Sequence, residues 1–174
     1  MHTPAHTFGL LGRYAEAAAV NERALALLSP AADKLVNAHA GDDFMDKVAR
    51  SVVQMAKARL GAEVALAEGQ ADAALQLQAQ AVEASKFTDR TEPPMLAAGS
   101  RLALGDMQLK AARWAQAEQS FRTALAEHPT SGWALRGLLQ SLQAQGKPAA
   151  ELAGVQAQLA ASFAAADAAL KPGL

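Results

Sequence analysis

The fold is decided by residues 112–125, which read ARWAQAEQSFRTAL. Two alanines in this stretch, Ala117 and Ala124, are seven residues apart. Seven residues make two turns of an α-helix, so both side chains lie on the same face. Small side chains on one face allow a helix to lie close against its neighbour. We therefore expect residues 113–127 to form a helix that packs tightly against another.

The same spacing of alanines occurs in two other parts of the chain. Ala17 and Ala24 form one such pair. Ala74 and Ala81 form another. In all three cases the first alanine lies five residues after a turn residue, so the chain contains at least three copies of one local pattern. A fourth, degenerate copy begins near residue 133, and Glu151 stands there where the small residue is expected.

These copies resemble the tetratricopeptide repeat, or TPR, a helix–turn–helix unit of ~34 residues with small residues at fixed positions. The third copy fits best, with matches at Leu104, Gly105, Ala117, Phe121, Ala124 and Pro129. The resemblance implies an all-α fold. It implies a short right-handed superhelix of antiparallel helix pairs, closed by a C-terminal capping helix.

The copies are interrupted by additional residues. Ala17 and Ala74 are 57 positions apart, and Ala74 and Ala117 are 43 apart, against a period of ~34. The longer excess begins at Ser29-Pro30, which is typical of the N-cap and first position of a short helix. We expect one domain made of a partial repeat (1–28), an irregular insertion (29–46), a second repeat (47–87), a linker loop (88–94), a third repeat (95–130), and a degenerate fourth repeat with a capping helix (131–172).

Helix boundaries follow from caps and apolar spacing. Gly41 ends the short helix of the insertion, and Asp42 or Asp43 can cap a longer helix that runs to Ala67. Further helices are expected at roughly 70–86, 95–110, 113–127, 131–145 and 148–170 from their apolar periodicity. Trp114 and Phe121 fall at structural positions of the repeat, and we expect both in the core.

Three further stretches, RTEPP at 90–94, AEQSFR at 117–122 and LQAQG at 142–146, are similar to a subgroup of bacterial TPR proteins. This subgroup is related to the tetratricopeptide repeat protein 38 type. Its members are generally longer, so we expect this chain to be a C-terminal portion or a shortened relative. The resemblance brings no known catalytic residues.

Composition excludes several classes of protein. The chain has 174 residues, with 45 alanines, 23 leucines and no isoleucine, which disfavours a β-rich fold. It has no cysteine, so disulfides, thiolate zinc sites and cysteine nucleophiles are excluded. With 16 basic and 17 acidic residues, it has no basic excess for binding nucleic acid. It lacks a run of ~18 apolar residues and the features of a signal peptide, so we expect a cytoplasmic protein without a membrane span.

No motif for catalysis or for a cofactor is present. His2 and His6 are four residues apart, but Pro4 lies between them and no glutamate completes a zinc motif. His39 lies near Asp42 and Asp43, whose expected role is helix capping rather than metal binding. No nucleophile, base or phosphate loop can be assigned. We therefore expect neither an enzyme nor a bound metal or cofactor.

The TPR resemblance implies a binding surface on the concave face, formed by the first helix of each repeat. Its register places there Arg59, Glu63, Leu102, Asp106, Leu109, Lys110, Trp133, Arg136, Gln140 and Gln143. Trp133 and Arg136 are three apart and can form an aromatic–cation anchor. The alternative is that Trp133 packs under the preceding loop and Arg136 is solvated. The lysine and asparagine pattern that grips C-terminal carboxylates in some TPR proteins is absent.

Two functions remain in competition. The first is a non-catalytic interaction module that binds a peptide or a partner helix on its concave face. The alternative is self-association into a homo-oligomer through the terminal helices. The alternative requires an exposed apolar stripe, for which the strongest candidate is Leu152, Val155, Leu159 and Phe163.

Overall fold

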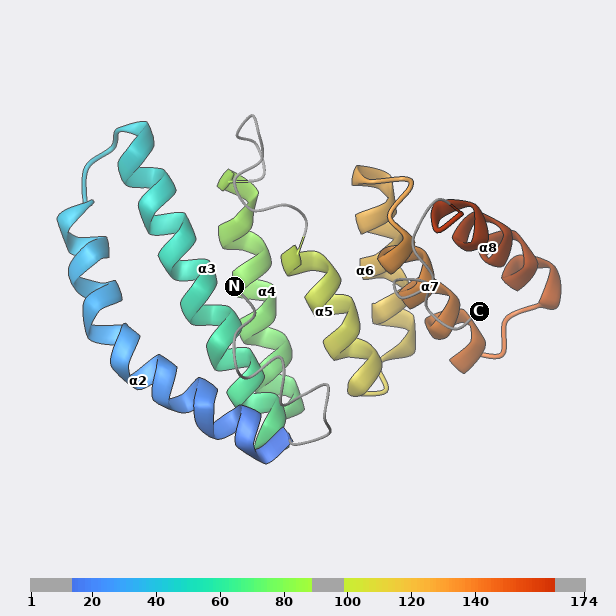
Figure 1. The fold of residues 1–174 in the computed structure, drawn as a ribbon, viewed down its shortest axis with the longest axis horizontal. Helices are drawn as coiled ribbons and strands as arrows, with labels where there is room; N and C mark the ends of the chain where they lie inside the picture. The colour runs from blue at the N-terminus through green and yellow to red at the C-terminus, as the bar shows by residue number, and fades with distance from the viewer. Residues whose placement is uncertain (1–13, 89–98, 165–174) are drawn as a thin grey trace. The chain divides into compact units, whose positions relative to one another are not determined.

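The computed structural model describes residues 14–88 and 99–164. All regular structure in these ranges is α-helical, which confirms the all-α prediction (Figure 1). The chain divides into two compact units, residues 1–100 and residues 101–174, and each has its own core. The arrangement of all the repeats as one array stays a prediction. The helices are α2 (Tyr14–Ala38), α3 (Phe44–Ala67), α4 (Ala71–Thr88), α5 (Gly99–Lys110), α6 (Trp114–Glu127), α7 (Gly132–Ala144) and α8 (Ala149–Ser162).

Most helix boundaries agree with the sequence signals. Asp43 is the N-cap of α3, and its carboxylate accepts a hydrogen bond of 2.8 Å from the backbone N–H of Asp46. This hydrogen bond lowers the pKa of Asp43 below its ordinary value. Helix α3 ends at Ala67, as predicted. The predicted segments 1–13, with His2 and His6, 89–98, with most of the predicted linker loop, and 165–172 lie outside the described residues.

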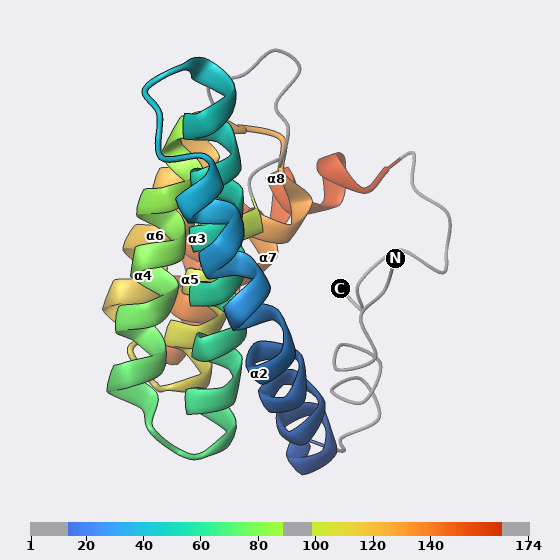
Figure 2. The same cartoon turned by 90° about the vertical axis from the view of Figure 1, so that its left-hand side faces the viewer.

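Within the predicted insertion at residues 29–46, the short helix is present as the second part of a longer one, but its predicted start at Ser29-Pro30 is wrong. Helix α2 is continuous from Tyr14 to Ala38 and contains Pro30 in its interior. Ser29 and Pro30 therefore do not begin a helix. Proline removes one intrahelical hydrogen bond and bends a helix, and Figure 2 shows that α2 changes direction along its length. The part of α2 after Pro30 is held by a contact with α3. The side-chain nitrogen of Lys57 on α3 lies 2.6 Å from a carboxylate oxygen of Asp33 on α2.

Three tight turns of one kind join α3 to α4, α5 to α6 and α7 to α8. Each has one residue in the left-handed region: Gly69 at φ +78°, Ala112 at +56° and Gly146 at +66°. In each turn the next N–H donates to the carbonyl five residues earlier, which is the Schellman arrangement. The bonds are Gln70 to Ala65 (2.8 Å), Arg113 to Gln108 (2.8 Å) and Lys147 to Leu142 (3.1 Å). The turns predicted from sequence at 69, 112 and 146 are therefore confirmed.

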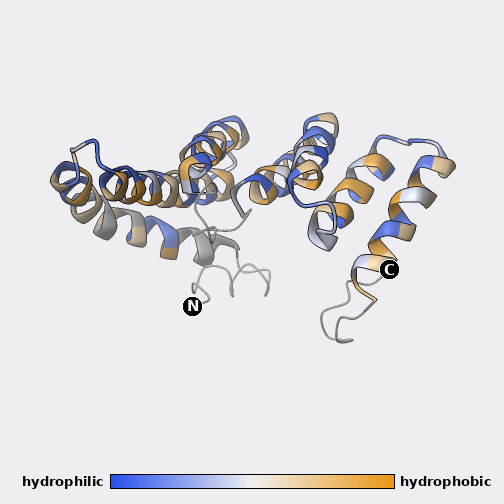
Figure 3. Cartoon of the chain, turned by 90° about the horizontal axis from the view of Figure 1, so that it is seen from above, coloured by the Kyte–Doolittle hydropathy of each residue, from blue (hydrophilic) through white to orange (hydrophobic). Residues whose placement is uncertain are grey.

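In the first unit α3 packs against α2 and α4, and small side chains lie at its contact with α4. Ala62, Ala74 and Ala81 are fully buried, and the predicted alanine pair of α4 is thereby confirmed as a contact surface. The hydroxyl of Ser51 on α3 donates to the backbone carbonyl of Ala84 on α4. In Figure 3 the helices carry both hydrophobic and hydrophilic stretches around their circumference, as expected of amphipathic helices.

In the second unit the core surrounds the ring of Phe121, which is fully buried. Two glycines on neighbouring helices leave room for it. A Cβ atom at Gly105 of α5 would lie 2.7 Å from the ring, and one at Gly137 of α7 would lie 2.2 Å from it. Ala117 and Ala124 of α6 are also buried, as the sequence predicted. The second unit thus combines the small contact positions with an aromatic ring that fills the space beside two glycines.

Helix α8 covers the end of this core. Its residues Val155, Leu159 and Phe163 are at most 9% exposed, and Leu152 packs against the same cluster. The stripe that the self-association hypothesis required to be exposed is therefore buried within the unit. It serves as a capping surface instead.

An ion-pair network joins α6 to α8 and to the turn before α8. Glu118 accepts hydrogen bonds from Arg122 (2.8 Å) and from the side-chain amide of Gln145 (2.9 Å). Arg122 also pairs with Glu151 at 2.7 Å. Burial alone would raise the pKa of Glu118, but the hydrogen bonds from Arg122 and Gln145 outweigh it, so the pKa is lowered. Glu151, which departs from the repeat pattern, thus has a structural partner.

Candidate interaction surface

Helix α7 buries one face and exposes the other. Ser131 is its N-cap, and Leu135, Leu138 and Leu142 of its buried face belong to the core of the second unit. The exposed side chains recur at intervals of three or four residues, so they form one line along the helix. We call this line the α7 stripe; it consists of Trp133, Arg136, Gln140 and Gln143.

The first two residues of the α7 stripe are in contact. The guanidinium carbon of Arg136 lies 6.0 Å from the centroid of the Trp133 ring, at the outer limit of a cation–π interaction. The same ring packs edge-to-face on Phe163, with 5.6 Å between centroids. Trp133 is nevertheless 54% exposed. The predicted meeting of Trp133 and Arg136 is confirmed, whereas the contact with Phe163 was not foreseen.

The α7 stripe carries one positive charge and no negative charge, because α7 contains no aspartate or glutamate. Within residues 14–88 and 99–164, no carboxylate pairs with Arg136. Two other arginines of this unit are occupied, since Arg101 pairs with Glu127 and Arg122 with Glu118. Of these three arginines, Arg136 is therefore the one without a carboxylate partner among the described residues.

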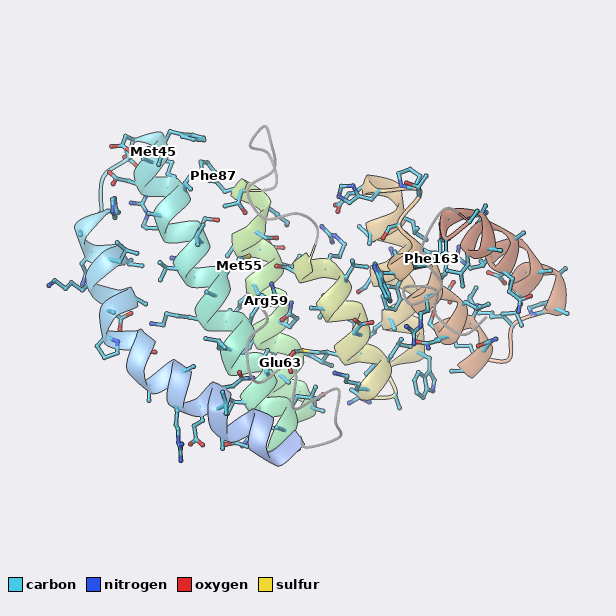
Figure 4. All side chains as sticks on the ribbon, viewed as in Figure 1. Met45, Met55, Arg59, Glu63, Phe87 and Phe163 are labelled. Atoms are coloured by element: carbon cyan, nitrogen blue, oxygen red, sulfur yellow. The ribbon has the colours of Figure 1, made fainter. Side chains whose placement is uncertain are left out.

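The other predicted binding residues are distributed over both units. In the first unit, Arg59 and Glu63 project from the same side of α3 and are exposed (Figure 4). In the second unit, Asp106 and Lys110 of α5 are exposed. Leu102 is half-buried and packs against the core, as does Leu109. These two leucines therefore contribute to the interior of the unit.

The expected core aromatics differ in burial. Phe121 is fully buried, as predicted. Trp114, the first residue of α6, is only half-buried, so the prediction holds for it in part. Its backbone carbonyl accepts a hydrogen bond of 3.4 Å from Gln145.

The aspartates near His39 cap and fasten a turn. Asp46 accepts a hydrogen bond of 2.7 Å from His39, and Arg50 donates to the carbonyl oxygens of His39 and Gly41. Asp43 caps α3, as predicted, and Asp42 only approaches Lys47 at 3.9 Å. In the described part of the chain, no three histidine, aspartate or glutamate side chains are grouped so that they could hold a metal ion.

A groove in the first unit was not anticipated. It has a volume of about 1240 Å³ and is lined by α2, α3 and α4, with Ala58, Gly61 and Leu77 among its apolar residues. Ser29 and Asp33, on either side of Pro30, form its wall on α2. The sequence pattern predicted that a helix starts at Ser29, whereas the groove requires α2 to continue through this residue. The residues that line the groove could therefore not be grouped from sequence.

One end of the first unit also exposes apolar side chains. Leu35, Phe44 and Met45 are 43%, 58% and 63% exposed, and the Phe44 ring lies 5.6 Å from that of Phe87. Figure 4 shows Met45 and Phe87 at the same end, where α3 begins and α4 ends. We call Leu35, Phe44 and Met45 the α2–α3 end patch.

Comparisons with known proteins found no matching protein-family model, no matching curated protein and no matching solved structure. Across the described residues, no helix has the length and apolar character needed to cross a bilayer.

Proposed function

We propose that this chain is a non-catalytic TPR-like module that binds another protein, and that its second unit makes the contact through the α7 stripe. In this proposal the helix pairs form a short right-handed superhelix, and the stripe belongs to its concave face. The protein acts in the cytoplasm as a scaffold, with kinship to bacterial TPR proteins.

Two features support the TPR-like arrangement. The turn residues Ala112 and Gly146 are 34 positions apart, which is the period of the TPR unit. The buried alanines Ala74 and Ala117 each follow their turn by five residues, so the same side chain packs at the same point of two hairpins.

The observation that carries the binding function is the exposure of Trp133. A tryptophan that is 54% exposed leaves a large apolar surface in water, and here its ring is held by Phe163 and Arg136. Tryptophan and arginine are the types most enriched where binding energy is concentrated. A ring already held in place loses little freedom when a partner covers it.

Affinity capture with the purified full chain tests this proposal. Quantitative mass spectrometry would compare proteins captured by wild type, Trp133→Ala and Arg136→Ala from a lysate of the source cells. A specific partner should be lost with both variants. Gln156→Ala and Lys34→Ala, which change exposed residues of α8 and α2, should retain it. Circular dichroism would verify the fold of each variant, and an unchanged list of captured proteins would contradict the proposal.

A second candidate function is self-association, which the α2–α3 end patch favours because each of its three large apolar side chains is exposed. Size-exclusion chromatography with light scattering at increasing concentration tests it. If the patch joins two copies, wild type forms a dimer and Phe44→Asp is a monomer. A wild-type protein that stays monomeric at the highest concentration would exclude this function.

A further inference from the structure

The composition of the α7 stripe specifies the chemistry of a partner, and this inference rests on the proposed binding function. Trp133 offers an apolar face, Arg136 offers a cation, and the two glutamines offer amides that both donate and accept. The stripe thus presents three different recognition elements in a fixed order along one helix.

Arg136 points to a carboxylate on the partner. Its guanidinium has no carboxylate partner within the described residues, and α7 carries no acidic side chain that would compete. Guanidinium groups bind carboxylates through two parallel hydrogen bonds. In the repeat register that the TPR resemblance implies, Gln140 corresponds to Glu63 of the second copy and to Asp106 of the third. A neutral amide therefore stands where the other copies have a carboxylate that would repel an acidic ligand.

The spacing of the stripe limits the length of the partner segment. At ~1.5 Å per residue, Arg136 lies ~4.5 Å along the helix from Trp133, and Gln143 lies ~15 Å from it. An extended chain advances ~3.3 Å per residue, so roughly five residues cover the stripe. The acidic residue then lies one or two positions from the side chain that covers Trp133.

A peptide fits these features better than single-stranded nucleic acid. Nucleic acid also uses aromatic stacking and arginine, but it needs several cations to follow its phosphates. The stripe supplies one cation, and the chain has a net charge of −1. The two amides match the alternating N–H and C=O groups of a peptide backbone.

We propose that the α7 stripe binds a short extended peptide in which an aspartate or glutamate lies one or two residues from an aliphatic or proline side chain. The apolar side chain covers Trp133, the carboxylate pairs with Arg136, and the backbone bonds to Gln140 and Gln143.

An array of acetylated, amidated hexapeptides tests this proposal, because blocked ends leave side chains as the only source of charge. The full-length protein should select peptides with the acidic and apolar residues at that spacing. Fluorescence polarisation would then measure the Kd of one selected peptide and of its counterpart with the acid replaced by its amide. We expect the amide peptide to bind about ten-fold more weakly, because one charge-assisted contact is lost.

Variants link the preference to the stripe. With Arg136→Gln, which alters an exposed side chain, the acidic and amide peptides should bind equally. Trp133→Phe should weaken both peptides, and the charge-matched control Lys34→Ala should change neither. An oligothymidine of twelve nucleotides should not compete; displacement of the peptide by this oligonucleotide would overturn the proposal in favour of nucleic acid.

The outcomes distinguish this inference from the function on which it rests. If selected peptides lack an acidic residue and binding still requires Trp133, the peptide chemistry is wrong and the interaction function stands. If no peptide binds and capture from lysate is unaffected by Trp133→Ala, both proposals fail.

Discussion

In the first unit α3 and α4 meet through fully buried alanines, whereas in the second unit α5, α6 and α7 meet around the ring of Phe121. In the first arrangement both helices have small side chains where they touch. In the second, one large side chain, Phe121, fills the space that is left free because Gly105 and Gly137 have no side chain. The comparison shows that one short repeat pattern permits close helix packing by two routes, which should respond differently to a change of volume.

The largest expected effect is the loss of the central ring of the second unit. Phe121→Ala should lower the free energy of unfolding by about 3–5 kcal/mol, because it removes a fully buried aromatic side chain and leaves a cavity. Urea unfolding followed by circular dichroism measures this loss. Phe87→Ala, at a half-buried position of the first unit, is the control and should cost much less. Equal losses would contradict the central role of Phe121.

The alanine packing of the first unit should be sensitive to added volume. Ala81→Leu should destabilise by about 1–3 kcal/mol, since Ala81 has no exposed surface and a larger side chain must separate α3 from α4. Thermal unfolding would measure the change against Ala79→Leu, an exposed position of the same helix, which should be nearly neutral. A tolerated leucine at 81 would show that the two helices are not in close contact there.

One polar contact from each unit should differ in its response to acid. The hydrogen bond from Ser51 to α4 in the first unit is neutral, whereas Glu118 and Arg122 of the second unit form an ion pair. The pKa of Glu118 is lower in the folded chain than its ordinary value of 4.5, so its stabilisation is fully present above pH 4.5. It is lost as the pH falls below that value through the folded pKa.

Replacing Glu118 therefore provides the measurement. Glu118→Gln should cost about 1–2 kcal/mol at pH 7, since a charge-assisted hydrogen bond is lost and Arg122 is half-exposed. The cost should shrink as the pH is lowered below 4.5 in a urea-unfolding series. Ser51→Ala should show a cost that does not change over this range. A pH-independent cost for Glu118→Gln would exclude an ionic role.

The smallest effect concerns the turns that close the hairpins. Ala112 and Gly69 adopt the same left-handed backbone, but only glycine does so without steric cost. Ala112→Gly should therefore stabilise the chain by about 0.5–1 kcal/mol, and Gly69→Ala should destabilise it by a similar amount. Melting temperatures should move in opposite directions. Ala79→Gly, at an exposed interior position of α4, should destabilise and thus controls for the general effect of glycine.

Sequence pattern predicted the parts of this structure that depend on local spacing. The turns at 69, 112 and 146 and the buried alanines Ala74 and Ala117 follow from positions along one helix or one turn. The continuity of α2 could not be predicted, because Ser29-Pro30 resembles a helix start. Asp33 and Lys57, whose contact holds α2 against α3, are 24 residues apart in the chain, so no local pattern shows that they meet. Packing of α2 against α3 therefore outweighs the helix-start signal of Ser29-Pro30.

In the candidate site, too, the contact within one helix was predicted and the contact between helices was not. The contact between Trp133 and Arg136 was predicted correctly because the two residues are one turn apart on a helix. The contact of Trp133 with Phe163 requires α8 to fold back on α7, and no local signal encodes it. The pairing of Arg122 with Glu151 likewise joins two helices and explains a residue that sequence reasoning regarded only as a departure from the repeat.

The position of Phe121 between two glycines also has a consequence for how this sequence can vary. The side chains at positions 105, 121 and 137 compete for the same space in the core, because a methyl group at either glycine would overlap the ring of Phe121. Substitutions at the three sites are therefore epistatic. Gly137→Ala should be harmful beside phenylalanine and harmless beside a smaller residue at 121, so related chains should change these positions together or not at all.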